Sequence, residues 1–166
     1  TATLPASTNF NSAEATVSIN VNKATATIAW NNPAAITYGT GLSDTQLNAT
    51  SSAPGTITYA PAAGTVLDAG DGQILMATLP ASTNFNSAEA TVSINVNKAT
   101  ATIAWNNPTA ITYGTGLSDT QLNATSSAPG AITYAPAAGT VLDAGDGQIL
   151  MATLPASTNF NSAEAT

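Results

Sequence analysis

The sequence predicts an all-β protein made of tandem β-sandwich domains, one for each period of an internal repeat, which are joined by very short extended linkers. The repeat is the first observation behind this prediction. The segment ATLPASTNFNSAEAT occurs at Ala2, Ala77 and Ala152, so its period is 75 (77 − 2 and 152 − 77), and the chain of 166 residues holds two periods followed by 16 more. A period of this length is the size of one small domain and exceeds that of most solenoid repeats.

The second observation is a series of short apolar-alternating runs separated by Asn, Asp, Gly and Pro, with no convincing helical period. Strand-forming Thr, Val, Ile and Tyr fill the runs, and turn-forming residues fill the connections. Six or seven short strands per period are typical of an immunoglobulin-like sandwich. In chain order, the expected strands are Ala24–Trp30, Ile36–Tyr38, Thr45–Thr50, Thr56–Tyr59, Thr65–Leu67, Gln73–Leu79 and Ala90–Asn97.

The alternation within each run also predicts which side chains point into the core, because side chains on a strand alternate between its two faces. The few differences between the copies (Ala34 and Thr109, Thr56 and Ala131, Thr1 and Met76) avoid these inward positions. The expected core residues are Val17, Ile19, Val21, Ile28, Trp30, Ile57, Tyr59, Leu75, Leu79, Val92, Ile94, Val96, Ile103 and Trp105.

The third observation is that the apolar residues move from one face of a strand to the other within a single run that contains no turn residue. Apolar residues occupy odd positions from Val17 to Val21 and even positions from Ala26 to Trp30, and the change falls near Lys23. A change of parity moves the apolar face to the other side of a strand. We therefore expect one domain to end and the next to begin at Lys23, and again at Lys98, with no room for a flexible linker.

The domain boundaries follow from these junctions. Residues 1–23 are the C-terminal strands of a preceding repeat, residues 24–98 are a complete repeat, and residues 99–166 are a second repeat without its last strand. That strand is spelled VSINVNK at Val92 and is present at Val17. Either 1–166 is a segment of a longer chain, which we favour, or the strand of one subunit completes the next subunit by strand donation. Both alternatives predict a head-to-tail, open-ended assembly.

Composition excludes several classes of function. The net charge is −7, two Lys are the only cations, and the chain has no Cys, His or Arg. Nucleic-acid binding requires basic residues, and disulfides or thiolate metal sites require Cys. No apolar run is long enough for membrane insertion. General acid–base catalysis at neutral pH favours His, and identical active sites in every period are implausible, so we expect no enzyme and no cofactor.

Several residues are candidates for local sites. Asp68 and Asp71, with their counterparts Asp143 and Asp146, could begin a calcium site, although a plain hairpin loop is the more economical interpretation. Lys23 and Lys98 fit a salt bridge or a solvated charge at a junction better than a covalent bond to Asn. The aromatic residues fit a core better than a sugar-stacking platform. Asn48 and Asn123 begin NAT sequons, which matter only if the source glycosylates secreted proteins.

A family resemblance supports the same interpretation. The motifs are ITYG at Ile36 and Ile111, PAAGTVLDAG at Pro61 and Pro136, and VNKAT at Val21 and Val96. Together they resemble the bacterial immunoglobulin-like repeats called MBG or YGX-type, over the whole chain. The resemblance implies an all-β module of a large secreted or surface protein, part of an adhesin or a structural array, with no catalytic residues.

We therefore expect a structural segment of an extracellular fibre or surface stalk, which associates with itself head to tail and could also bundle laterally. The alternative is an adhesive module that binds a ligand through loop tips or outward rows of Thr, such as Thr25 with Thr27 and Thr56 with Thr58. Uniform repeats favour the fibre.

Overall fold

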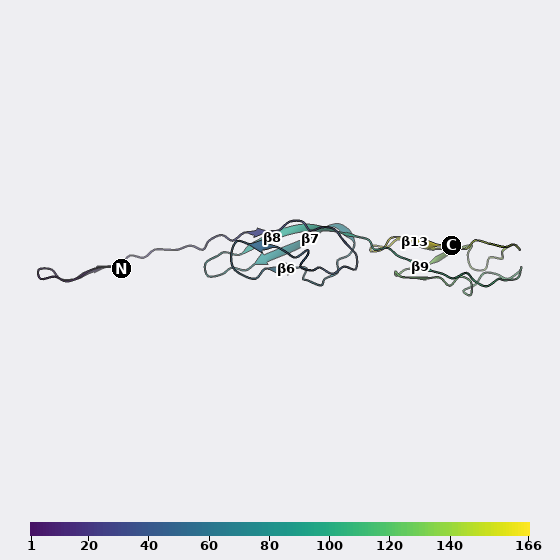
Figure 1. Ribbon diagram of the computed structural model, residues 1–166, viewed down its shortest axis with the longest axis horizontal. Coiled ribbons are helices and arrows are strands. Elements are labelled where there is room, and N and C mark those ends of the chain that lie inside the picture. The colour runs from purple at the N-terminus through teal and green to yellow at the C-terminus, as the bar shows by residue number, and fades with distance from the viewer.

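The structure, a computed structural model, describes all of residues 1–166 and contains no helix. The prediction of an all-β chain is confirmed. A small hairpin of β1 (Ala2–Leu4) and β2 (Ala13–Ala15) is followed by an extended segment, the first repeat (residues 24–98) and the second repeat (residues 99–166). These parts follow one another along the long axis of a narrow molecule (Figure 1).

The first repeat contains two sheets. One has two strands, and the other has four strands in the order β4-β8-β7-β6. The strands are β3 (Ile28–Ala29), β4 (Ile36–Thr37), β5 (Thr50–Ser51), β6 (Thr58–Ala60), β7 (Gly70–Leu79) and β8 (Ala88–Asn97), with β3 paired to β5.

The long hairpin of β7 and β8 is the centre of the larger sheet. Its register pairs Leu75 with Val92, and β8 also runs parallel to β4, with Ile36 opposite Val96. Along both strands buried residues alternate with more exposed ones, because successive side chains point to opposite faces. The outer face of β8 is largely polar, whereas that of β7 also carries the exposed Ile74 and Met76. The strand β8 is therefore held between β7 and β4, with a neighbour on each side.

The inward side chains of the first repeat form two clusters. The larger contains Leu42, Leu47, Leu75, Val92 and Ile94, with Trp30, Ile36, Tyr59 and Leu67 packed against it. The smaller contains Ala26, Ala53 and Leu79, with Ile28, Ile57, Phe85 and Ala88 packed against it. Among the expected core residues of this repeat, Leu75, Leu79, Val92, Ile94 and Val96 are buried. Ile28, Trp30, Ile57 and Tyr59 are half-buried at its margins.

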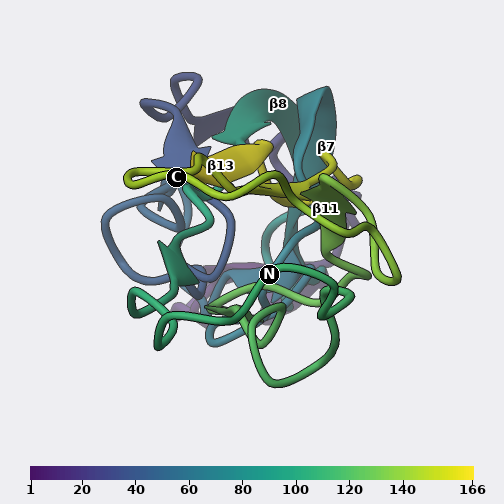
Figure 2. The same cartoon turned by 90° about the vertical axis from the view of Figure 1, so that its right-hand side faces the viewer.

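The second repeat carries fewer and shorter paired strands. They are β9 (Ile103–Ala104), β10 (Thr125–Ser126), β11 (Thr133–Ala135), β12 (Met151–Leu154) and β13 (Ala163–Ala165), arranged in the sheets β10-β9 and β11-β12-β13. The smaller cluster recurs here as Ala101, Ala128 and Leu154, with Ile103 packed against it. Trp105 is half-buried. Viewed from its end, the second repeat lies in front of β7 and β8 of the first (Figure 2).

Three expected strands are shorter than the sequence indicates. The strand expected at Thr45–Thr50 is wrong for most of its length, because Gln46 closes a turn in which its Oε1 accepts a hydrogen bond from Ser43 N at 3.1 Å. Of Thr65–Leu67, only Val66 pairs, through a single bridge to Gly41. In Ala24–Trp30, regular pairing is confined to β3 and one bridge at Ala24.

The largest departure concerns the segment before the first repeat. Val17, Ile19 and Val21 were expected in a core, but they are 94%, 86% and 88% exposed. Within residues 1–166 this segment pairs with no other strand. The alternation predicts a strand with one apolar face, but burial also requires a sheet to receive that strand, and none lies beside it (Figure 1).

Candidate functional site

The junction between the two repeats spans a single residue. Strand β8 ends at Asn97, and Ala99 already pairs with Phe160 of the second repeat in a parallel bridge. Two backbone hydrogen bonds of 2.9 Å hold that bridge, one from Ala99 N to Asn159 O and one from Asn161 N to Ala99 O. Only Lys98 lies between the last residue of β8 and this first bridge of the second repeat, and the first paired strand of that repeat, β9, begins at Ile103.

The side chain of Asn159 connects the repeats a second time. Its Oδ1 accepts a hydrogen bond from Ala69 N at 2.7 Å, and its Nδ2 donates to Asp68 Oδ1 at 2.9 Å. Because the amide donates and accepts at once, it fixes both the distance and the orientation of the Asp68 loop. The acceptor is a carboxylate, which makes a stronger hydrogen bond than a neutral oxygen does.

An aromatic pair completes the junction. The rings of Tyr38 and Phe160 meet edge to face, with centroids 5.4 Å apart and planes at 73°. Such pairs stabilise a contact by about 0.5–1.5 kcal/mol beyond the area they bury. Tyr38 follows β4 of the first repeat and Phe160 precedes β13 of the second, so this contact joins loops far apart in sequence.

The two Lys residues have different surroundings. Lys98 Nζ donates to Ser157 O at 2.6 Å, which adds a further contact across the junction. Lys23 lies in the exposed segment before the first repeat. The sequence prediction named Lys98 as a junction residue but named none of the contacts that Asn159, Phe160 and Tyr38 make there. The available signal was the segment STNF, which recurs in every period.

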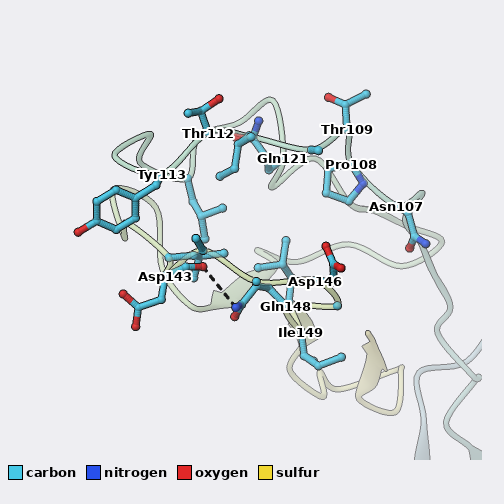
Figure 3. A pocket seen from close by; sticks show the side chains of 18 of the residues that line it. Asn107, Pro108, Thr109, Thr112, Tyr113, Gln121, Asp143, Asp146, Gln148 and Ile149 are labelled. Carbon is cyan, nitrogen blue, oxygen red and sulfur yellow. Dashed lines mark hydrogen bonds between the residues drawn. The ribbon is translucent and has the colours of Figure 1, made fainter.

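A groove opens in the second repeat. It encloses about 760 Å³ and is lined by apolar residues that include Trp105, Ile111, Leu117, Leu142 and Leu150, together with polar loops. Figure 3 shows the polar rim, with Asn107 and Thr109 on one side and Asp143 and Gln148 on the other. Gln148 Nε2 donates to Asp143 O at 3.4 Å along this rim.

The groove lies where the first repeat holds β8. Leu150 is half-buried, whereas its counterpart Leu75 is fully buried against β8. Tyr113 is 71% exposed, whereas its counterpart Tyr38 is half-buried against Phe160. In the second repeat, β13 takes the position of Ala88–Ala90 of β8, and residues 99–166 hold no counterpart of Val92–Asn97, the part of β8 that covers this lining in the first repeat.

The calcium candidates do not gather into a metal site. No three acidic side chains lie close enough together to hold an ion. Asp68 instead accepts the hydrogen bond from Asn159, and Asp71 lies at the start of β7. Asp143 and Asp146 line the groove of the second repeat.

The remaining surface candidates are exposed. Asn48 and Asn123 lie on turns, where the side-chain amide of each donates to the carbonyl oxygen three residues earlier at 3.1 Å. The expected rows, Thr25 with Thr27 and Thr56 with Thr58, also face solvent.

No protein-family model matches the chain. No curated protein sequence matches it either. The structure has no helix of the length and apolarity needed to cross a membrane.

Proposed function

We propose that this chain is a structural repeat segment of an extracellular fibre or surface stalk. Head-to-tail immunoglobulin-like domains would provide its length and stiffness. The observation that carries the proposal is the junction at Lys98, where one residue separates the end of β8 from the first β-bridge of the second repeat.

The contacts across that junction support stiffness. Three contacts join different parts of the first repeat to the second. They are the hydrogen bond between Ala69 and the Asn159 amide, the Tyr38–Phe160 pair and the Lys98 hydrogen bond. A bend that separates any of these pairs would break the contact made there. A Gly- or Ser-rich linker would instead behave as a random coil and let the domains reorient.

The repetition itself supports a role in spacing. Every period carries the same surface, and a surface that recurs once per period suits a load-bearing array better than a single recognition site. The resemblance to bacterial immunoglobulin-like repeats supports the same role and an extracellular or cell-surface location. The exposed Thr rows fit the adhesive alternative, but the pair Thr25 with Thr27 recurs as Thr100 with Thr102, and Thr56 is replaced by Ala131, so neither row marks a distinctive tip.

Small-angle X-ray scattering on chains of two, four and eight periods tests this proposal. The maximum dimension should rise in direct proportion to the number of periods, because each junction repeats the same geometry. Matched chains with Ala at every position equivalent to Asn159 and Phe160 should be shorter. If the unmodified chains instead grow roughly as the square root of the number of periods, as flexible coils do, the proposed spacer role is wrong.

A further inference from the structure

We propose that the bond between Asp71 and Gly72, at the start of β7, is a site of spontaneous aspartate isomerisation, and that Asn95 controls the rate of the reaction. The product loosens the loop that contacts the next repeat. The site and its chemistry follow from the first repeat alone, and only the consequence for a fibre rests on the proposed function.

Strand β7 contains a β-bulge at this bond. The register shifts between Gly70 and Gln73, so that Asp71 and Gly72 of β7 together face a single residue of β8, Asn95. A bulge of this kind leaves one residue outside the regular ladder of hydrogen bonds. Gly72 has a φ of +66°, a left-handed conformation that glycine adopts readily and that other residues rarely adopt. The bulge therefore requires a glycine directly after Asp71.

An aspartate followed by glycine can rearrange without an enzyme. The backbone nitrogen of Gly72 attacks Cγ of Asp71, and the protonated carboxyl group loses its OH, which leaves as water with the amide proton. Water then adds to the main-chain carbonyl carbon of Asp71 in this five-membered succinimide and breaks its bond to the nitrogen. In the resulting isoaspartate, the main chain runs through Cβ and Cγ. Glycine favours the first step because it has no side chain to obstruct the approach.

Asn95 holds the nitrogen that must attack. Gly72 N donates a hydrogen bond to Asn95 Oδ1 at 2.8 Å, and this bond satisfies the donor that the bulge takes out of the ladder. Attack on Asp71 requires the nitrogen to leave this acceptor and lose its proton, so the hydrogen bond must break first. Asp71 and Gly72 are both exposed, so water reaches the bond. The Asn95 amide therefore slows a reaction that the sequence otherwise favours.

The loop that contacts the next repeat lies directly before the bulge. Ala69 N donates to Asn159 Oδ1 at 2.7 Å, and Asp68 Oδ1 accepts from Asn159 Nδ2 at 2.9 Å. Ala69 is separated from Asp71 only by Gly70. A change in the length of the main chain at Asp71 therefore acts on both contacts with Asn159.

The pairing of β7 determines which side of the bulge moves. Isomerisation adds one carbon atom, Cβ, to the main chain at Asp71. Beyond the bulge, β7 pairs continuously with β8 over Gln73–Leu79, whereas only Gly70 pairs with β8 before it. The added length should therefore displace the weakly held side, where Ala69 meets Asn159, and leave the long hairpin in place.

The same dipeptide recurs in each period. Asp71 and Asp146 are the two aspartates of the chain that precede glycine. In a fibre of the proposed kind, each complete repeat would carry one such site beside its junction. Isomerisation would then loosen the junctions one at a time as the material ages, and this consequence rests on the proposed function.

Mass spectrometry of the 166-residue chain after incubation for weeks in near-neutral buffer tests the site. Trypsin cleaves after Lys23 and Lys98, so the fragment 24–98 separates Asp71 from its copy Asp146. Electron-transfer fragmentation then measures isoaspartate at Asp71. Asn95→Ala should raise its rate of formation at least about fivefold, which corresponds to the loss of a hydrogen bond worth about 1 kcal/mol.

Two controls separate the role of Asn95 from a general loss of structure. Asn97→Ala removes another exposed amide from β8 and should leave the rate unchanged. Amide hydrogen exchange along Gln73–Leu79 should be the same with and without Asn95→Ala. Equal rates of isomerisation in the unmodified and Asn95→Ala chains would overturn the proposal. A rise in exchange along β7 that matches the rise in isomerisation, or no isoaspartate at Asp71 in either chain, would also overturn it.

Hydrogen exchange at the Ala69 amide tests the effect on the junction. It should be faster in the isomerised chain than in the fresh chain, because Ala69 N loses its acceptor on Asn159. Unchanged exchange at Ala69 would overturn the link between the bulge and the junction. None of these readouts depends on the dimensions of longer chains in scattering experiments, so this proposal and the proposed function can fail separately.

Discussion

Replacement of Leu75 by Ala is expected to lower the free energy of unfolding of the first repeat by about 2–5 kcal/mol. Leu75 is fully buried in the larger cluster and lies opposite Val92 of β8. Loss of its side chain removes apolar contacts and leaves a cavity that the two long strands cannot easily close. Urea unfolding measured by the fluorescence of Trp30, in a Trp105→Phe background, reports this repeat alone.

The chain supplies its own matched comparison. Leu150→Ala is the same substitution at the equivalent position of the second repeat, where the side chain is only half-buried beside the open groove. Its cost should be well below about 2 kcal/mol. Leu79 and Leu154 are each 1% exposed, so Ala at these two positions should cost similar amounts. Equal losses for Leu75→Ala and Leu150→Ala would contradict the difference in packing between the repeats.

Extension of the chain beyond Thr166 by the sequence VSINVNK is expected to stabilise the second repeat. The added strand should take the place that β8 has in the first repeat and should bury Ile111, Leu150 and its own apolar face. The thermal midpoint reported by Trp105 should rise by about 10 °C or more, which corresponds to about 2 kcal/mol for a domain of this size.

The control extension carries Asp in place of its Ile and should leave the midpoint unchanged, because a carboxylate cannot enter the groove without a large desolvation cost. If neither extension changes the midpoint, or both raise it equally, the groove is not a site for a β8-like strand.

The sequence predicts the long strands of the fold better than the short ones. The run that forms β8 alternates apolar and polar residues, and the run that forms β7 places Leu75, Ala77 and Leu79 on its buried face, so local preference and burial agree. The strand expected at Thr45–Thr50 also alternates, but Ser43 and Gln46 hydrogen-bond locally and turn the chain there. Such side chains compete with sheet pairing, and alternation alone does not reveal the competition.

The junction shows that the sequence pattern is equally limited in what it predicts about the candidate site. The change between odd and even apolar positions near Lys98 predicts where the junction lies, because this pattern can be read within a single run of the sequence. The contacts of Asn159 with Ala69 and Asp68 join residues about ninety positions apart, and no local pattern specifies them. Alternation likewise identified the apolar face of residues 17–21, but it could not tell that no strand of the same molecule covers it.

The most direct test of a rigid junction is a measurement of the distance between the two repeats across Lys98. The chain has no Cys, so spin labels can be attached at Thr56→Cys and Ala131→Cys, two exposed positions that already differ between the copies. Pulsed electron paramagnetic resonance should give one narrow distance distribution. That distribution should broaden when Asn159 and Phe160 are both replaced by Ala. A distribution that is already broad, and that these replacements leave unchanged, would contradict a rigid junction.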